Sequence, residues 1–338
     1  MLNFDVDRFL SIQGGAVGLA DSLDACVREC MQRRPVDSVY FVGSGGAGIL
    51  MYPAAHLLAR SSSIRSFAPF AAEVVLQPDV HLGPNSLVIA PSRSGTTAET
   101  VTVMNHARSL GAATIALVAH GDTPVTEASE FSFVNFAADD TSSESFYLQS
   151  LLVALSVMQM RGDITNRDEI VGQLALLPQA LVNAKEAFEE RAAVLAQFIA
   201  DSDYHIISGS GNVWPEAYYY SMCILEEMQW IRTRPVHASD FFHGTLELVE
   251  ADTSLLLLKG EDHTRPLVDR VETFARTLTD RVQVIDSADV ELAGISAEVR
   301  ALVAPAVFAT LLERVNAHLE VIRDHPLTTR RYYRQIAY

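Results

Sequence analysis

The stretch from Val88 to Val101, "VIAPSRSGTTAETV", joins an apolar run to a pattern typical of a helix. Its centre, Ser92 to Thr97, holds four hydroxyl residues, one glycine and one arginine. The apolar residues before it are typical of a buried strand, and "AETVTVMNHARSLG" after it predicts a helix that ends at Gly111. A strand, a polar turn and a helix in this order predict one unit of an α/β fold.

The same order recurs along the chain, which predicts a parallel sheet with helices on both faces. The first glycine-rich segment, "VYFVGSGGAGILMYPAA", is matched in the second half of the chain by "YHIISGSGNVWPEA". Both contain an apolar strand, Gly-Ser-Gly and a helix start near a proline. We therefore predict an internal duplication, with a first domain at residues 1–180, a second domain at 181–338 and the boundary near residues 175–185.

The composition limits the classes of partner. The chain has 338 residues and a formal net charge of −17, so its surface repels nucleic acid and anionic membranes. Three cysteines are too few for a disulfide framework, and neither a membrane span nor an apolar signal sequence is evident. We expect a cytoplasmic protein that binds a small molecule, with no nucleic acid and no membrane as partner.

The segment Ser92–Thr97 has the properties of an anion-binding turn. A turn that leads into a helix exposes backbone N–H groups at the positive end of the helix dipole. Hydroxyl groups add O–H donors, and Gly95 lets the backbone approach a ligand closely. A simple helix cap accounts for one hydroxyl, but not for four in six residues. The corresponding turn of the second half, "GEDHT", carries acids that repel a phosphate, so we expect one phosphate site per chain.

The first glycine loop, Gly43–Gly48, satisfies the G-x-G-x-x-G pattern of dinucleotide-binding proteins. That type of site also requires an acid about 20 residues further on, where "SSSIRSF" offers Arg65 and serines instead. The G-x-x-x-x-G-K-[ST] motif of nucleotide triphosphate sites does not occur either. We therefore expect no nicotinamide or nucleotide cofactor. We expect no metal either, because no His or Cys cluster near Cys26 and Cys30 completes a metal site.

"SRSGTTAET" resembles the Ser-x-Ser-Gly-x-Thr-x-[DE]-Thr signature of SIS (sugar isomerase) domains, which bind phosphosugars. The doubled pattern resembles the isomerase half of glucosamine-6-phosphate synthase. The segment "EEMQWIRTRPVHASDFFHGTLELVEADT" is similar to the corresponding segment of the fructosamine-6-phosphate deglycases. The resemblance covers essentially the whole chain, and it implies two tandem SIS domains, each a flavodoxin-like three-layer αβα sandwich with a parallel sheet.

The resemblance also implies a set of substrate-binding residues. The family's phosphate contacts fall on Ser92–Thr97, here called the hydroxyl turn, and on the first glycine loop. The synthase has a glutamine where this chain has Arg93. A serine-rich loop of the family falls on "DTSSES", and the basic residue of its C-terminal tail best matches Arg334, with Arg331 and Tyr333 as the other candidates. The residues implied in this way are Ser44, Gly45, Ser92, Arg93, Ser94, Thr97, Ser142, Ser143 and Arg334.

Two adjacent acids, Glu226 and Glu227, end a helix that is otherwise apolar and aromatic. Adjacent helix positions point about 100° apart, so we expect only one of them to face the site. Counting from the second glycine loop, Gly209–Gly211, selects Glu226. In the family, the catalytic glutamate lies sixteen residues before a His-Gly pair, and that spacing selects Glu227 together with His243. The resemblance implies Glu227 as the base and His243 as the residue that assists ring opening. In relatives this histidine reaches into the neighbouring subunit, which implies a dimer.

These features predict a deglycase that converts a fructosamine 6-phosphate, such as fructoselysine 6-phosphate, and water to glucose 6-phosphate and an amine. A carboxylate near C1 and C2 and a proton donor near the oxygen suit this chemistry. One alternative is isomerisation of a phosphosugar, or deamination of glucosamine 6-phosphate, at the same site. A second alternative is a phosphosugar-sensing regulatory module, which has no need of an acid–base pair. The identity of the amine stays open.

Overall fold

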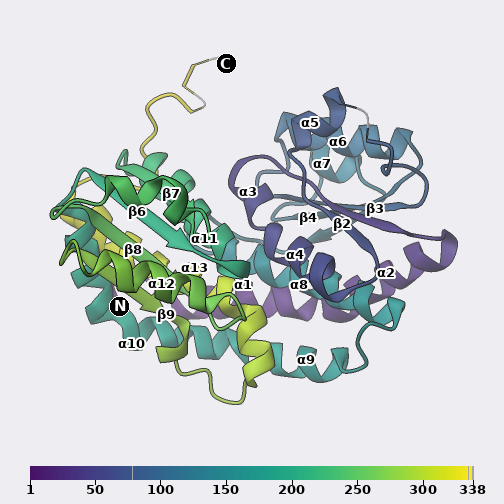
Figure 1. The fold of residues 1–338 in the computed structure, drawn as a ribbon. Helices are drawn as coiled ribbons and strands as arrows, with labels where there is room; N and C mark the ends of the chain where they lie inside the picture. The colour runs from purple at the N-terminus through teal and green to yellow at the C-terminus, as the bar shows by residue number, and fades with distance from the viewer. Residues whose placement is uncertain (78, 334, 337–338) are drawn as a thin grey trace. The chain divides into compact units, whose positions relative to one another are not determined.

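The computed structural model describes residues 1–77, 79–333 and 335–336. They form two compact units, each with its own parallel sheet (Figure 1). The first-sheet unit comprises Val6–Gln179 and Gly294–Val299. The second-sheet unit comprises Met1–Asp5, Ala180–Ala293 and the described residues from Arg300 on. The α/β class with parallel strands is therefore confirmed.

The first-sheet unit is built on parallel strands in the order β2-β1-β3-β4-β5. Every residue of β3 and β4 is buried, as expected for apolar strands covered on both faces. The edge strand β5 was not expected from the sequence, because it is short and alternates between half-buried and exposed residues. The strands are β1 (Ser38–Phe41), β2 (Arg65–Phe67), β3 (Ser86–Ser92), β4 (Ala113–Val118) and β5 (Phe131–Val134).

Helices cover both faces of this first sheet. In Figure 1, α5, α6 and α7 lie on one face, and α2, α4 and the long helix α8 lie on the other. Val88 of β3 packs with Val103 and Met104 of α6 in the core below the first group. The helices are α1 (Val6–Gly18), α2 (Ala20–Arg33), α3 (Gly45–Ile49), α4 (Tyr52–Ser61), α5 (Ala71–Leu76), α6 (Ala98–Ser109), α7 (Pro124–Glu127), α8 (Ser142–Arg161) and α9 (Arg167–Leu174).

The second-sheet unit contains parallel strands in the order β7-β6-β8-β9. Matching β6 to β9 with β1 to β4 gives the same strand order as in the first sheet. The strand β7, "RTRPVH", was not expected, because it contains Pro235 and charged residues. Its edge position explains the proline, which has no N–H to donate to a further strand. The strands are β6 (Tyr204–Gly209), β7 (Arg232–His237), β8 (Ser254–Lys259) and β9 (Val282–Asp286).

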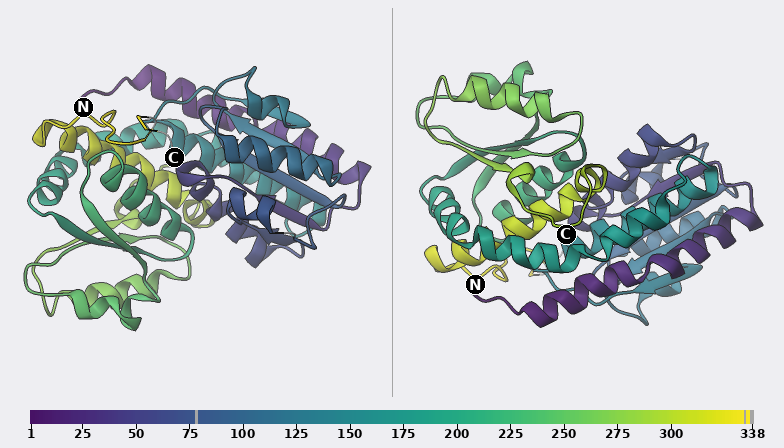
Figure 2. Two further views of the ribbon diagram at one scale, coloured as in Figure 1. Left: turned by 90° about the horizontal axis from the view of Figure 1, so that it is seen from above. Right: turned by 90° about the horizontal axis from the view of Figure 1, so that it is seen from below.

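The long helices α10 and α13 lie on one face of this second sheet and α12 lies on the other, as both views of Figure 2 show. The core beneath α12 includes Leu255 and Leu257 of β8 and Val268 and Val271 of α12. The helices that lie wholly or mostly in this unit are α10 (Leu177–Ala200), α11 (Trp214–Tyr219), α12 (Arg265–Ala275) and α13 (Ala297–Ile322), with the short helices η1 (Gly211–Val213), η2 (Tyr220–Glu226), η3 (Phe241–His243), η4 (Thr245–Leu248) and η5 (Ser287–Asp289).

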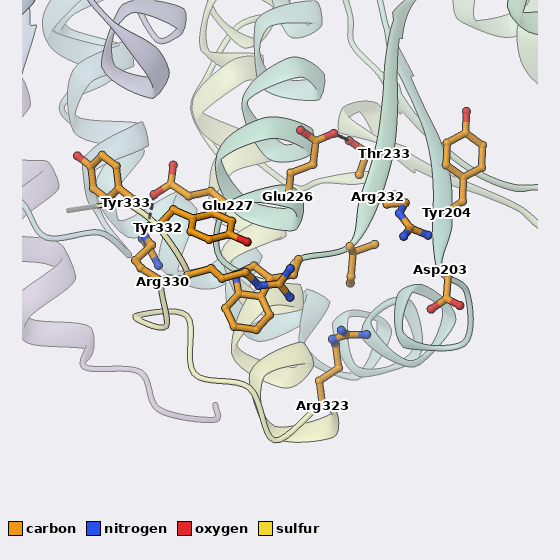
Figure 3. A pocket seen from close by; sticks show the side chains of 13 residues that line it. Asp203, Tyr204, Glu226, Glu227, Arg232, Thr233, Arg323, Arg330, Tyr332 and Tyr333 are labelled. Carbon is orange, nitrogen blue, oxygen red and sulfur yellow. Dashed lines mark hydrogen bonds and ion pairs between the residues drawn. The ribbon is translucent and has the colours of Figure 1, made fainter. Parts of the chain in front are cut away.

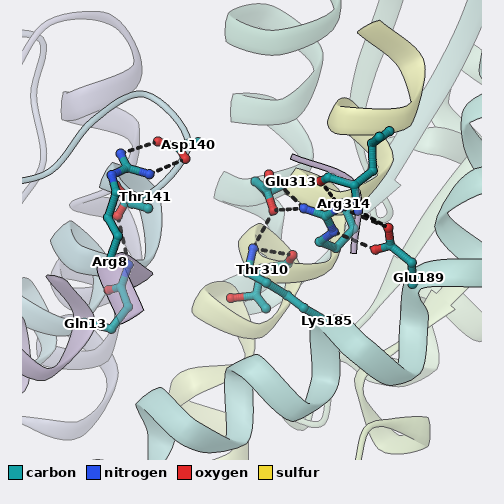
Figure 4. Close-up of polar contacts among 10 residues, drawn as sticks. Arg8, Gln13, Asp140, Thr141, Lys185, Glu189, Thr310, Glu313 and Arg314 are labelled. Carbon is teal, nitrogen blue, oxygen red and sulfur yellow. Dashed lines mark hydrogen bonds and ion pairs between the residues drawn. The ribbon is translucent and has the colours of Figure 1, made fainter. Parts of the chain in front are cut away.

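Buried ion pairs join α10 to α13 (Figure 4). Lys185 Nζ lies 2.6 Å from Glu313 Oε2, and Arg314 Nε lies 2.7 Å from Glu189 Oε2. Burial alone opposes ionisation of Glu189, but hydrogen bonds from Arg314 and from the N–H of Leu2 hold its pKa down to about 2. These contacts attach the first residues of the chain to the second-sheet unit. None of the helices in the described residues is long and apolar enough to cross a bilayer.

A buried histidine in the second sheet hydrogen-bonds to two backbone carbonyls and one hydroxyl. His205 on β6 has Nε2 3.1 Å from the carbonyl oxygens of Ile199 and Ser202, and Nδ1 2.7 Å from Ser254 Oγ. Because carbonyls only accept, we assign the ring hydrogen to Nε2 and let Nδ1 accept from the hydroxyl. Burial lowers the pKa of His205, although the two carbonyls favour the charged ring.

We expect this histidine to weaken the fold at acidic pH. Its pKa in the folded state lies below the value of about 6.5 for the unfolded chain, so the unfolded state takes up the proton first. The contribution of neutral His205 to the free energy of unfolding is therefore complete above about pH 6.5. It is lost as the pH falls from there through the pKa of the folded state. Urea unfolding at several pH values should show a shallower loss for His205→Gln than for the wild type. Equal slopes, each up to about 1.4 kcal/mol per pH unit, would contradict this assignment.

Candidate active site

The hydroxyl turn and the first glycine loop meet at one point of the first sheet. The chain leaves β1 toward β2 on one side, and it leaves β3 toward β4 on the other side. The loops after these neighbouring strands therefore diverge, and ligands of open α/β sheets bind in the crevice that such a divergence creates. Ser44 and Gly45 follow β1, while Ser92 ends β3. The structure thus brings two of the predicted groups together.

The hydroxyl turn owes its shape to Gly95, which has φ +67°. The Gly95 N–H donates to Ser92 Oγ at 3.0 Å, and its carbonyl accepts from the Val125 N–H at 3.0 Å. A Cβ atom at position 95 would lie 2.3–2.5 Å from the side chain of Thr123. Ser92 is buried within the turn, whereas Ser94 and Thr97 are half-buried. Both the backbone conformation and the space at this turn therefore require glycine.

Arg93 contacts an acid of its own unit. Its guanidinium lies 2.8 Å from Asp139, and both side chains are about half exposed. This ion pair links the hydroxyl turn to the loop that precedes α8. The sequence did not predict this partner, because Asp139 is distant along the chain. The predicted role of Arg93 at a substrate phosphate stays a prediction.

The predicted residues Ser142 and Ser143 form the first turn of α8 and are buried. The loop before them is held by α1: Arg8 makes two hydrogen bonds to Asp140, at 2.7 and 2.9 Å, and Gln13 donates to the carbonyl of Thr141 (Figure 4). The helix start therefore has a fixed place beside the loop that Arg93 binds.

The corresponding point of the second sheet is filled by a carboxylate of the chain itself. Asp262 accepts hydrogen bonds from the backbone N–H of Asn212 at 2.9 Å and of Thr264 at 2.8 Å. A Cβ atom at Gly211 would lie 2.1 Å from this carboxylate. Asp262 thus takes the place that an anion would take, which gives a structural reason to expect only one phosphate site per chain.

Removal of this carboxylate should leave backbone donors that an added anion can satisfy. We expect Asp262→Ala to lower the melting temperature by several degrees, since each unsatisfied donor costs about 1–3 kcal/mol. Phosphate or sulfate should then raise the melting temperature of the variant more than that of the wild type. Equal responses of the two proteins to both anions would contradict the role given to Asp262.

The two adjacent glutamates end a π-helix. Residues Tyr220–Glu226 form η2, and the Glu227 N–H bonds to the carbonyl of Met222 at 3.1 Å. A π turn holds more residues than an α turn, and such turns are frequent at functional sites. Both Glu226 and Glu227 line one cavity (Figure 3). This cavity therefore does not choose between the two glutamates, and the expectation that only one of them faces the reacting carbon stays a prediction.

This cavity has a volume of about 940 Å³ and lies within the second-sheet unit. Acids, arginines and aromatic side chains share its wall, as Figure 3 shows. The lining residues are Asp203, Tyr204, Glu226, Glu227, Trp230, Ile231, Arg232, Thr233, Arg323, Arg330, Arg331, Tyr332 and Tyr333. Its mixed charge suits a ligand that is itself polar and charged.

Distinct contacts separate the two glutamates. Glu226 is exposed and accepts a hydrogen bond from the Thr233 hydroxyl at 2.5 Å. Glu227 is half-buried, and its Oε1 lies 2.9 Å from Nε of the largely buried Arg330. This ion pair fixes the Glu227 carboxylate at the wall of the cavity, and the charge of Arg330 balances that of the carboxylate (Figure 3). This arrangement distinguishes Glu227 from its neighbour.

The sequence did not single out Arg330. The predicted tail residue, Arg334, lies outside the described residues. The basic tail indicated an anion-binding role, but the sequence alone does not show which of its arginines pairs with Glu227. Arg331, the next residue, places its guanidinium 3.9 Å from the ring centre of Trp230, which attaches the tail to the cavity wall.

His243 lies in η3 of the same unit but does not line the cavity of Glu227. Its side chain is exposed and makes no hydrogen bond or ion pair with any residue that the structure describes. The predicted partnership between Glu227 and His243 is therefore not seen within this chain. Among the described residues there is also no cluster of three His, Cys, Asp or Glu side chains that could hold a metal.

Comparisons with known proteins show the family of this chain. A family model, the SIS domain, matches residues 34–159. Over 314 residues the chain is 31% identical to fructosamine deglycase FrlB of Bacillus subtilis (strain 168), and the match covers 91% of this chain and 94% of the relative. The chain belongs to the fructosamine deglycase family. The resemblance seen in the hydroxyl signature is thereby confirmed.

Other members and more distant proteins share this family's fold. The fructoselysine 6-phosphate deglycase of Escherichia coli (strain K12) is 29% identical over 90% of this chain and 88% of its own length. A crystal structure of a Bacillus subtilis protein described as a phosphosugar isomerase superposes with a TM-score of 0.88 at 30% identity, over 94% of this chain and 97% of that chain. The C-terminal domain of glucosamine-fructose-6-phosphate aminotransferase from Francisella tularensis, at 14% identity and a TM-score of 0.79, has the same fold.

Proposed function

We propose that this fructosamine deglycase family member converts a fructosamine 6-phosphate and water to glucose 6-phosphate and a free amine. The observation that carries the proposal is the Glu227 carboxylate, held by Arg330 on the wall of a charged cavity. Such a carboxylate suits the removal of a proton from the carbon beside a carbonyl. The relatives with high coverage, named for fructosamine and fructoselysine 6-phosphate deglycases, support the same reaction.

In the proposed mechanism Glu227 removes a proton from C1 of the open-chain ketosamine. The electron pair of that C–H bond forms a C1–C2 double bond while the C2=O π bond breaks and its oxygen takes up a proton, which gives an enaminol. The C1–C2 electron pair then takes a proton at C2 while the nitrogen lone pair forms a C1=N bond, which gives a protonated imine at C1. Water adds to this imine, the C1–N bond breaks, and glucose 6-phosphate and the amine leave. His243 assists ring opening before the first step, as the family resemblance implies.

The phosphate is assigned to the hydroxyl turn of the first sheet. Ser92, Arg93, Ser94 and Thr97, with Ser44 and Gly45 of the neighbouring loop, are the proposed contacts. Their position at the divergence of β1 and β3 supports this assignment. Ser142, Ser143 and Arg334 remain further candidates for contacts with the sugar or its phosphate.

We also infer a finer architecture and assembly. The repeated strand order supports two tandem SIS domains with a flavodoxin-like arrangement, of residues 1–180 and 181–338. The exposed position of His243 is consistent with its action on the substrate of a second copy of the chain, so the proposed assembly is a dimer with a shared active site. A cytoplasmic location stays a prediction from composition.

One assay separates the proposed reaction from its alternatives. The purified protein is incubated with fructoselysine 6-phosphate, other 6-phosphofructosamines and glucosamine 6-phosphate, and glucose 6-phosphate and ammonia are measured. We expect glucose 6-phosphate and the amine in equal amounts from a fructosamine. Ammonia from glucosamine 6-phosphate alone would favour a deaminase, and binding without turnover of any substrate would favour a phosphosugar sensor.

A further inference from the structure

Among the residues that the structure describes, three of the four arginines on the wall of the Glu227 cavity lack an acidic partner, and one of these three, Arg331, packs on the ring of Trp230. Arg232, at the start of β7, is exposed and makes no hydrogen bond or ion pair with any described residue. Arg323 donates from one terminal nitrogen to the carbonyl of Gln229 at 3.3 Å, while its Nε is buried without a hydrogen-bond acceptor in the part of the chain that the structure describes. Arg330, by contrast, already pairs with Glu227.

A buried guanidinium N–H without an acceptor needs an explanation, because nearly all buried donors in proteins are satisfied. Guanidinium groups bind carboxylates and phosphates through short, strong, charge-assisted hydrogen bonds. Because the sugar phosphate is assigned to Ser92–Thr97, a carboxylate is the group left for these arginines. The chain as a whole carries a net charge of −17, yet Arg232 and Arg323 have no acidic partner among the described residues. These observations point to an anionic group on the ligand.

We propose that Arg232 and Arg323 form a subsite for a carboxylate on the amine that the fructosamine carries. This inference rests on the proposed function, in which the sugar phosphate binds at the turn Ser92–Thr97. The anion that binds Arg232 and Arg323 must then belong to the amine part of the substrate. Asp203 lines the same cavity, is exposed and has no partner among the described residues, so it complements an ammonium group beside that carboxylate (Figure 3). An amino acid attached through its side-chain amine presents both groups.

Three matched substrates test the subsite. They are the 6-phosphofructose conjugates of lysine through its ε-amine, of 6-aminohexanoate, which lacks only the α-ammonium, and of 1,5-diaminopentane, which lacks only the carboxylate. We expect kcat/KM for the diaminopentane conjugate to be about 10–100-fold below that for the lysine conjugate, as for loss of a charge-assisted hydrogen bond. The aminohexanoate conjugate should retain most of the activity. Equal kcat/KM for the lysine and diaminopentane conjugates would overturn the subsite.

Variants assign the effect to the two arginines. Arg323→Gln and Arg232→Gln should each reduce the ratio of kcat/KM between the lysine and diaminopentane conjugates toward one. Arg234→Gln is the matched control, because Arg234 lies on the same strand, bonds Thr245 and does not line the cavity, so the ratio should stay at the wild-type value. Melting curves of each variant show whether it is folded, and the exposed Arg232 offers a test with little risk to the fold.

The outcomes distinguish the subsite from the function beneath it. If both variants lose the same factor with all three conjugates, the arginines hold the shared sugar phosphate and the subsite is wrong, while the deglycase reaction stands. If the wild type releases glucose 6-phosphate from none of the conjugates, the proposed function fails and the subsite fails with it.

Discussion

Replacement of Glu227 by glutamine is expected to lower deglycase turnover by about 10²–10⁴-fold, the usual contribution of a general acid or base. Glutamine keeps the size of the side chain but cannot accept the C1 proton. It also removes the charge that Arg330 balances. Binding of glucose 6-phosphate, measured by calorimetry, should survive, because the phosphate contacts are assigned to other residues. Turnover should be measured by release of glucose 6-phosphate under saturating substrate.

Glu226→Gln is the matched control for this experiment. It makes the same chemical change one residue away, at a carboxylate that is exposed and bonded to Thr233. We expect a much smaller loss of turnover than in Glu227→Gln. A larger loss in Glu226→Gln would instead assign the base to Glu226, the residue that the count from the second glycine loop selects.

Gly95→Ala is expected to reduce phosphosugar affinity by about 100-fold or more. The added methyl group would collide with Thr123 and would strain a backbone at φ +67°, so the turn must move. Loss of several charge-assisted hydrogen bonds to one phosphate follows from that movement, and each is worth about 1.5–3 kcal/mol. The dissociation constant of glucose 6-phosphate measures the effect.

Gly172→Ala serves as the control for this change. The added methyl group at position 172, in α9, meets no atom within 4 Å, so the same substitution is tolerated there. Unchanged affinity in Gly95→Ala, in a protein that melts as a folded chain, would contradict the assignment of the phosphate to this turn.

Much of the fold could be predicted from the sequence because it depends on local pattern. The apolar runs that become β3 and β4 are fully buried, and the hydroxyl turn after β3 leads into α6 as expected. The edge strand β7 was missed because its exposed position allows charged residues and a proline, which hide the usual strand pattern. The π turn before Glu227 was missed because it retains the composition of an α-helix.

The site could be predicted only in part, because its remaining contacts join distant segments. The pairing of Arg330 with Glu227 depends on how the C-terminal tail returns to η2. The ion pair of Arg93 with Asp139 and the filling of the second anion position by Asp262 are likewise tertiary. Sequence spacing, taken with the family resemblance, predicted roles for Glu227 and His243, but it contains no information on which cation each acid meets.

The central claim, removal of a C1 proton from a fructosamine 6-phosphate, is tested most directly by running the reaction in D₂O with fructoselysine 6-phosphate. Nuclear magnetic resonance then identifies the sugar phosphate and its label. Protonation of an enaminol at C2 predicts glucose 6-phosphate with deuterium at C2, together with an equal amount of lysine. Fructose 6-phosphate as the product would mean direct cleavage of the C1–N bond without loss of a C1 proton, and would contradict the account.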